Sequence, residues 1–168
     1  MPARPAWLGV SPGYLPAQLA CGVLLGVAMF VAAAFLQREL GRRRGGLVLP
    51  GGGRDLALQT AYYILNAPLE EGIFRGLLQG GLGALLGPPL GPPLSFLVGT
   101  ATYVLYHRLG RWSWAEVAAT ALAGVPLGLA FWLLPGPPSL LGVTVAHAAA
   151  TCGFLGPGPY LLRSLGRL

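Results

Sequence analysis

Residues 15–36 read LPAQLACGVLLGVAMFVAAAFL, a run of 22 positions without a formally charged side chain. A helix of this length rises about 33 Å, which is enough to cross the roughly 30 Å hydrocarbon core of a bilayer. The run is followed by Arg38 and the cluster 42–44, a flank typical of a stop-transfer segment. The alanines at 32–34 would also suit a signal-peptide cleavage site, but only Arg4 precedes the run. We therefore expect an uncleaved membrane anchor.

Composition extends this interpretation to the whole chain of 168 residues. Hydrophobic residues make up 54%, charged residues make up 10%, and the mean hydropathy is +0.64. Soluble domains average about 25% charged residues, so the bilayer is the expected solvent of this single domain. The net charge of +6 comes from eleven basic residues, all arginine and mostly at the ends of apolar stretches, which argues against nucleic-acid binding. The lysine-free composition, rich in Gly, Ala, Leu, Arg and Pro, predicts a prokaryotic plasma-membrane protein.

Four further apolar segments predict an all-α bundle of about five transmembrane spans. After a Gly/Pro/Arg-rich loop at 41–54, these spans are expected at 69–87, 94–107, 114–134 and 139–155. Pro68 should kink or break the chain near Asn66, which leaves residues 56–67 either spanning or lying at the interface. Small residues at four-residue spacing favour close helix packing in lipid. The expected packing glycines are Gly72, Gly76, Gly80, Gly83 and Gly87.

The arginines predict how the bundle is oriented. If the N-terminus is outside and the C-terminus inside, nine of the eleven lie on the cytoplasmic side, as the positive-inside rule requires. The exceptions are Arg4, which is outside, and Arg75, which lies within a span. We divide the chain into an N-terminal anchor with its Arg-rich cytoplasmic loop (1–54) and an intramembrane core (55–168). The nine are Arg38, Arg42, Arg43, Arg44, Arg54, Arg108, Arg111, Arg163 and Arg167.

Two adjacent glutamates interrupt the second predicted span, in the stretch PLEEGIFRG at 68–76. Ionisable residues in apolar spans are costly and by default indicate a functional site. Glu71 and Arg75 have i, i+4 spacing and can pair, whereas Glu70 points about 100° away on the helix. A carboxylate left free in low-dielectric surroundings suits a general base. The alternative is a purely structural ion pair, which would leave Glu70 without a role.

Two further polar stripes with i, i+3, i+7 spacing occur on other predicted spans. They consist of Thr100, Tyr103 and His107, and of Thr144, His147 and Thr151. We expect the three polar features to face one another, and a glutamate with two histidines can activate water, hold a metal or stabilise an oxyanion. No serine or cysteine lies at helical spacing from either histidine, so a covalent nucleophile finds no support. Structural alternatives are an interfacial His107 and an interhelical hydrogen bond from His147.

At these residues the chain resembles the CPBP family, which comprises CAAX proteases of the second type and bacteriocin-processing or self-immunity proteins. That family is marked by E-E-x-x-x-R, F-x-x-x-H and H-x-x-x-N (or a similar last residue) on separate transmembrane helices. The first motif is matched completely, the second has Tyr in place of Phe, and the third has Thr in place of Asn. The matching residues are Glu70, Glu71 and Arg75, then Tyr103 and His107, then His147 and Thr151.

The resemblance implies an intramembrane endopeptidase acting on membrane-associated peptide or protein substrates near the cytoplasmic face, with membrane lipid around it. By position, Glu70 would activate the attacking water and His107 would position or polarise it. His147 and Thr151 would stabilise the oxyanion. The roles implied for Glu71 and Arg75 are to shape the site.

The cofactor and the activity both have alternatives. The family is described both as metal-dependent and as glutamate-type, so a divalent metal such as zinc, held by Glu70, His107 and His147, stays open. The Thr151 hydroxyl could serve as a shorter oxyanion donor than Asn, or the change could mark lost activity. In the second case the chain would be a non-catalytic immunity or scaffold protein that retains the protease fold. A small transporter is a third candidate, although no inverted repeat supports it.

Overall fold

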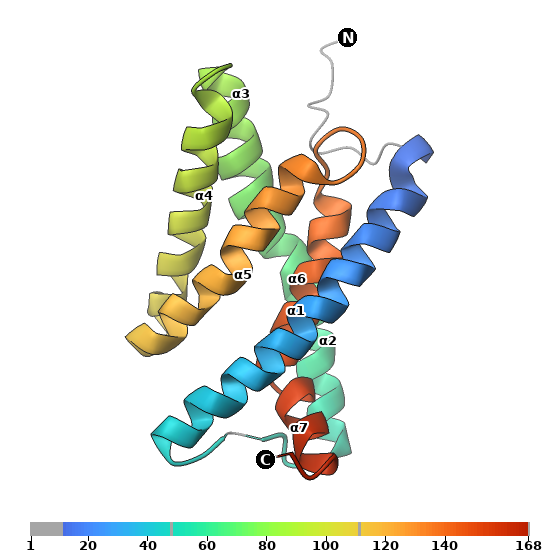
Figure 1. Ribbon diagram of the computed structural model, residues 1–168, viewed down its shortest axis with the longest axis vertical. Coiled ribbons are helices and arrows are strands. Elements are labelled where there is room, and N and C mark those ends of the chain that lie inside the picture. Colours follow the sequence, from blue (N-terminus) through green and yellow to red (C-terminus); the bar gives the residue numbers. More distant parts are fainter. Residues whose placement is uncertain (1–11, 48, 111, 168) are drawn as a thin grey trace.

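The computed structural model describes residues 12–47, 49–110 and 112–167, and within these ranges every regular element is a helix. The all-α prediction is therefore confirmed for the described residues. Successive long helices run in alternating directions along the bundle (Figure 1). In chain order the elements are the 3-10 helix η2 (Pro12–Tyr14), α1 (Leu15–Arg44), α2 (Gly53–Glu71), the π-helix η3 (Gly72–Gly81), α3 (Leu82–Leu86), α4 (Gly91–Tyr106), the 3-10 helix η4 (His107–Gly110), α5 (Trp114–Leu133), α6 (Leu140–Phe154) and α7 (Pro157–Ser164).

Local sequence signals set several helix boundaries. Ser113 caps α5 in a reciprocal capping box: its hydroxyl accepts from the Glu116 N–H at 3.3 Å, and the Glu116 carboxylate accepts from the Ser113 N–H at 2.8 Å. Helix α1 continues to Arg44 and ends at Gly45. The φ of Gly45 is 81°, the left-handed conformation that glycine adopts easily. The arginine cluster predicted to lie in the loop 41–54 is therefore the last turn of a helix.

Of the kink or break predicted near Asn66, the break does not occur, because α2 continues through Pro68 to Glu71 and leads directly into η3. Proline removes one backbone hydrogen bond from a helix. A full break would free several more backbone groups, and in apolar surroundings these would have no water to replace their partners. Continuing the helix therefore costs less free energy than ending it, and the residues before and after Pro68 belong to one continuous helix.

Polar side chains are buried and large apolar side chains are exposed, which is the reverse of a soluble domain. Buried polar residues include Gln18, Glu71, Arg75, Gln79 and His147, each 3% exposed or less. The outward faces of the helices carry exposed leucines, valines and isoleucines over most of their length. A contiguous apolar exterior of this kind suits lipid contact, in agreement with an integral membrane protein.

Two of the described helices are long and apolar enough to cross a bilayer: η2 with α1 (Pro12–Arg44) and α5. The pair α6 and α7, which meet at 51°, makes a third if it counts as one broken span. The end of α1, the start of α2 and α7 lie at one end of the bundle (Figure 1). The last turn of α1 holds Arg42, Arg43 and Arg44, the first turn of α2 holds Arg54, and α7 holds Arg163, so these segments carry five of the nine arginines predicted to be cytoplasmic. Arg4 and Arg111 lie outside the described residues. The five-span count and the orientation stay predictions.

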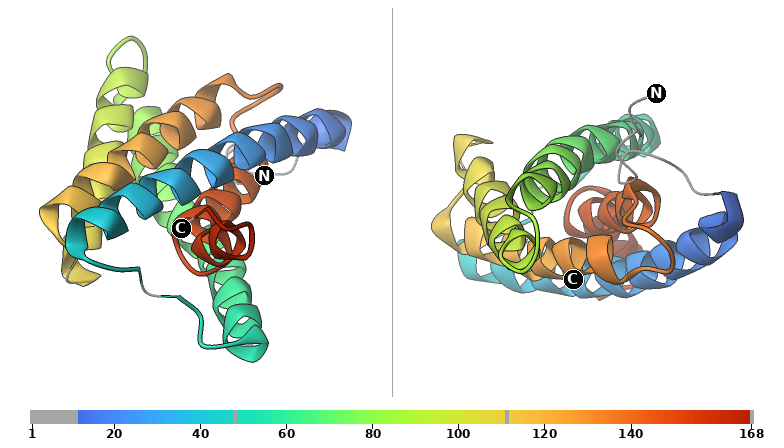
Figure 2. Two further views of the ribbon diagram at one scale, coloured as in Figure 1. Left: turned by 60° about the horizontal axis from the view of Figure 1, so that its bottom comes forward. Right: turned by 90° about the horizontal axis from the view of Figure 1, so that it is seen from above.

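Close glycine packing joins α1 to α6, which lie across each other in the bundle (Figure 2). A Cβ added to Gly22 would lie 2.6 Å from the carbonyl oxygen of Gly142, so the two backbones are in direct contact. The predicted packing stripe of the second span is only partly correct. Gly83 packs tightly against Ser95, but neither Gly72 nor Gly87 has a neighbour within 4 Å of an added Cβ.

This difference predicts unequal effects of two matched substitutions. Gly22→Ala should lower the free energy of unfolding by about 1–3 kcal/mol, because the new methyl group overlaps the α6 backbone. Gly72→Ala should be neutral or stabilising by up to about 1 kcal/mol, because a helical glycine with open space gains from a side chain. Unfolding of the purified protein in mixed micelles measures both, and equal effects would contradict the packing contact.

Candidate active site

The glutamate motif lies where α2 changes into a π-helix. Glu70 and Glu71 are the last two residues of α2, and η3 begins at Gly72. A π-helix has i→i+5 hydrogen bonds and a wider turn than an α-helix, and it occurs frequently at functional sites. The wide turns of η3 direct two long polar side chains, Arg75 and Gln79, into the interior of the bundle, where both are fully buried.

These two side chains attach η3 to the backbone of α5. The Arg75 Nη2 donates to the Gly124 carbonyl at 3.1 Å, and the Gln79 Nε2 donates to the Gly128 carbonyl at 2.7 Å. Both pairs are four residues apart on their helices, so they form two rungs of one ladder. The two glycines also let α4 pack closely against α5. For example, a Cβ added at Gly124 would lie 2.9 Å from the Tyr103 ring. The ladder fixes the motif helix relative to the rest of the site.

Glu71 is fully buried and contacts two basic side chains through one carboxylate oxygen. Its Oε1 lies 3.4 Å from the Arg75 Nη1, which confirms the predicted i, i+4 pair. The same oxygen lies 2.6 Å from the His147 Nδ1, and this is its shorter contact. The prediction gave Glu71 only Arg75 as its partner, so the structure adds the histidine of α6. Glu71 thus joins η3 to α6 at the centre of the bundle.

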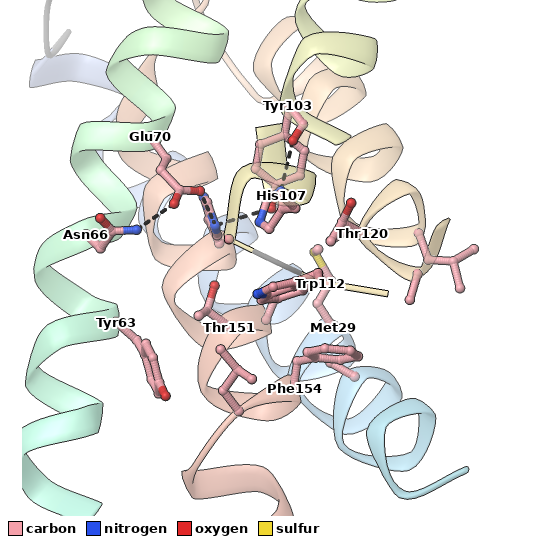
Figure 3. Close-up of a pocket in the computed structure, with 18 of the residues that line it drawn as sticks. Met29, Tyr63, Asn66, Glu70, Tyr103, His107, Trp112, Thr120, Thr151 and Phe154 are labelled. Atoms are coloured by element: carbon pink, nitrogen blue, oxygen red, sulfur yellow. Dashed lines mark hydrogen bonds and ion pairs between the residues drawn. The ribbon is translucent and has the colours of Figure 1, made fainter. Parts of the chain in front are cut away.

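Glu70 lies at the wall of a cavity and is held by a residue that the sequence prediction missed. The Asn66 Nδ2, one turn earlier on α2, donates to the Glu70 Oε1 at 2.6 Å. The second oxygen, Oε2, is buried without a hydrogen-bond partner and lies 3.5 Å from the His147 Nε2. Glu70 is therefore not free in the sense predicted: one oxygen is anchored by Asn66 (Figure 3), and the other faces His147.

One tautomer of the neutral His147 ring is consistent with its contacts. Because a carboxylate only accepts, we assign the proton on Nδ1 to the hydrogen bond with Glu71. The Nε2 of the neutral ring is then an acceptor, and the Tyr103 hydroxyl donates to it at 3.4 Å. The Glu70 carboxylate, also an acceptor, faces the same nitrogen. Two acceptor atoms this close to each other need a hydrogen-bond donor, and a water molecule in the cavity can donate to both.

His107 is placed by its backbone and by aromatic rings. Its Nδ1 donates to the Tyr103 carbonyl at 2.8 Å, so Nε2 is again the acceptor of the neutral ring. The ring packs edge-on against Tyr103, Tyr106 and Trp112, with centroid distances of 4.8, 5.7 and 4.9 Å. Trp112 in turn stacks on Phe154 of α6.

A cavity of about 600 Å³ connects the predicted residues. Glu70, His107, His147 and Thr151 all line it, and Figure 3 shows the labelled ones among them around one space. The rest of its lining is mostly apolar and comes from α1, α2, α4, η4, α5 and α6. α1 alone contributes Met29, Ala32, Ala33 and Leu36. The cavity therefore combines a polar end, formed by the three motifs, with an apolar remainder.

The predicted metal ligands do not gather into a three-residue site. Among the described residues, no group of three or more His, Cys, Asp or Glu side chains is close enough to hold a metal ion. Only Glu70 and His147 approach each other, at 3.5 Å, and His107 lies elsewhere on the cavity wall. The arrangement of Glu70, His107 and His147 does not fit a zinc site. No step of the reaction proposed for this chain is assigned to a metal.

The comparison with protein families is decisive for the class of the chain. Residues 53–152, more than half of the sequence, match the model of the family described as type II CAAX prenyl endopeptidase Rce1-like. The chain belongs to the Rce1-like family. The matched region contains all three motifs and runs from the start of α2 into α6. Searches of curated proteins and of solved structures gave no match.

Membership in the Rce1-like family supports intramembrane endopeptidase activity on membrane-associated peptides. The site residues predicted from the sequence fall into two groups within this Rce1-like core. Glu70, Glu71, Arg75 and His147 form one connected network of contacts. His107 and Thr151 line the same cavity but form no hydrogen bond or ion pair with the carboxylates of that network. Asn66 and Gln79 were missed, although each lies four residues from a motif residue, which is the signal that could have identified them.

Proposed function

We propose that this chain is an intramembrane endopeptidase that hydrolyses peptide bonds with a water molecule activated by Glu70, without a covalent acyl-enzyme. The observation that carries the proposal is the pair formed by the Glu70 Oε2 and the His147 Nε2. Both are acceptors, they lie 3.5 Å apart, and both residues line the 600 Å³ cavity. A water molecule at the cavity side of this pair can donate one hydrogen to each atom and present its oxygen lone pair to a substrate carbonyl.

The reaction then follows from the proton positions. As the water oxygen bonds to the peptide carbonyl carbon, its proton passes to the Glu70 carboxylate and the carbonyl oxygen becomes an oxyanion. The protonated Glu70 next delivers this proton to the leaving nitrogen as the C–N bond breaks. The products are an amine and a carboxylic acid, and Glu70 is again ionised. Its anchor from Asn66 holds the carboxyl group in place throughout.

Other residues of the site position the reactants. His107 presents an acceptor nitrogen to the cavity and orients the water or a substrate N–H. Thr151, one turn beyond His147 on α6, offers a hydroxyl donor to the oxyanion. Glu71 fixes the His147 ring through Nδ1, as a carboxylate orients a catalytic imidazole. The arginine distribution favours cleavage near the cytoplasmic face of a prokaryotic plasma membrane.

The test is hydrolysis by the purified full chain in liposomes. Fluorogenic peptides with and without an isoprenoid-modified C-terminal cysteine are the substrates, and mass spectrometry identifies the bond cleaved. We expect one specific cleavage, and a loss of at least about 100-fold in rate for His147→Ala, because the acceptor opposite Glu70 is lost. Arg43→Ala, on the exposed end of α1, is the control and should keep full activity.

Two results would contradict this proposal. Absence of any peptide product from the wild-type chain would exclude the protease and favour a scaffold that retains the fold. Full activity of His147→Ala would exclude the proposed geometry. The assay is repeated after treatment with a chelator: activity lost on chelation and recovered with zinc would replace the metal-free mechanism.

A further inference from the structure

Tyr103 contacts three other motif residues of the site. Its backbone carbonyl accepts from His107, its hydroxyl donates to the His147 Nε2, and its ring lies under the Arg75 guanidinium at 4.3 Å from the centroid. The residue is 3% exposed and lines the cavity. Figure 3 shows its side chain above His107, on the opposite side from Thr151.

The hydroxyl of Tyr103 is a buried donor with one weak acceptor. Its bond to the His147 Nε2 is 3.4 Å long, well beyond the usual 2.7–2.8 Å for a hydroxyl donor. Hydrogen bonds to ionised acceptors are shorter and about twice as strong as those to neutral ones. An oxyanion formed nearby would therefore draw this hydroxyl away from the neutral imidazole nitrogen.

The oxyanion of the proposed reaction forms within reach of this hydroxyl. In the proposed reaction the attacking water bonds to the Glu70 Oε2 and the His147 Nε2 from the cavity side, and the Tyr103 hydroxyl approaches the same Nε2. The guanidinium over the ring withdraws electron density from it, which makes the phenol a stronger donor. The ring itself is held by Phe74 and His107 in edge-to-face contacts, so the hydroxyl is preorganised.

We propose that Tyr103 is a further catalytic residue, whose hydroxyl donates a hydrogen bond to the oxyanion; the proposal rests on the proposed function. It also explains the two departures of this chain from the motif pattern. Thr151 stands where an asparagine is usual and offers a single, shorter donor. Tyr103 stands where a phenylalanine is usual and adds a hydroxyl to the same cavity. The Tyr103 hydroxyl thus supplies a hydrogen-bond donor that is lost where Thr151 stands in place of asparagine.

The experiment compares four proteins in the liposome assay. Tyr103→Phe removes one oxygen atom and keeps the ring, so we expect kcat to fall by about 100-fold with KM unchanged, the loss typical of one oxyanion donor. The double variant Tyr103→Phe/Thr151→Asn regains a second donor, so its kcat should be at least about tenfold higher than that of Tyr103→Phe. Tyr160→Phe on α7, away from the cavity, should match the wild type.

The outcomes separate the two proposals. If the wild type hydrolyses peptide and Tyr103→Phe has the same kcat, Tyr103 has no catalytic role, while the proposed function stands. A rise in KM alone would make Tyr103 a substrate-binding residue and overturn the oxyanion role. No recovery in the double variant would overturn the exchange of donors. Absence of hydrolysis by the wild type would overturn both proposals. The thermal midpoint of each variant shows that the fold is kept.

Discussion

Glu70→Gln is expected to lower kcat for peptide hydrolysis by about 1,000-fold. General acid–base catalysis contributes about 10²–10⁴-fold to a rate, and the amide of glutamine cannot take the proton from water. The substitution preserves the shape of the side chain, and the amide oxygen can still accept the hydrogen bond from Asn66. The loss should therefore appear in kcat, with KM and the thermal midpoint near their wild-type values.

A matched control is Glu39→Gln on α1. Glu39 is exposed at the end of the helix and pairs with Arg42 and Arg43, so its charge is remote from the cavity. It should keep wild-type activity in the same liposome assay with the same peptides. Glu70→Gln with more than a tenth of wild-type kcat would mean that another group activates the water.

The second large effect concerns stability. Arg75→Met should lower the free energy of unfolding by about 3–5 kcal/mol, because it leaves the fully buried Glu71 without its cationic partner. It also removes the donor to the Gly124 carbonyl, one of the two rungs between η3 and α5. Total stabilities of proteins are about 5–15 kcal/mol, so this loss is a large fraction of the whole.

Unfolding by sodium dodecyl sulfate in mixed micelles, followed by circular dichroism, measures this change. Arg42→Met, at a side chain 75% exposed, is the control and should change stability by less than about 1 kcal/mol. The double variant Glu71→Gln/Arg75→Met should recover part of the loss, because removing both members of a buried pair costs less than removing one. An Arg75→Met protein as stable as the control would contradict the buried pair.

The sequence predicts well those features that depend on neighbouring residues. Apolar runs without charge gave helices at nearly the expected positions, and the spacing of Glu71 and Arg75 gave their ion pair, since side chains four residues apart meet on any helix. The three motifs also reach one cavity, as their order on separate helices suggested. These inferences need only helix geometry and the cost of burying charge.

Features that depend on packing between helices could not be predicted. Helical spacing says that Glu70 and Glu71 point in different directions, but only the position of α6 decides that His147 bonds to Glu71 at 2.6 Å and faces Glu70 at 3.5 Å. The π-helix has no sequence signature that distinguishes it from an α-helix. The hydrogen bond from Gln79 to the Gly128 carbonyl therefore could not be predicted from the sequence. The path of α2 through Pro68 likewise depends on its surroundings.

The wall that α1 contributes to the cavity lies outside the residues that define the family. The family match begins at residue 53, whereas Met29, Ala32, Ala33 and Leu36 border the same space as Glu70. The reactive groups and part of the lining are thus encoded in two segments that can diverge independently. Substitutions in α1 can reshape what the cavity admits without altering the proposed catalytic residues, so substrate selectivity and chemistry can change separately.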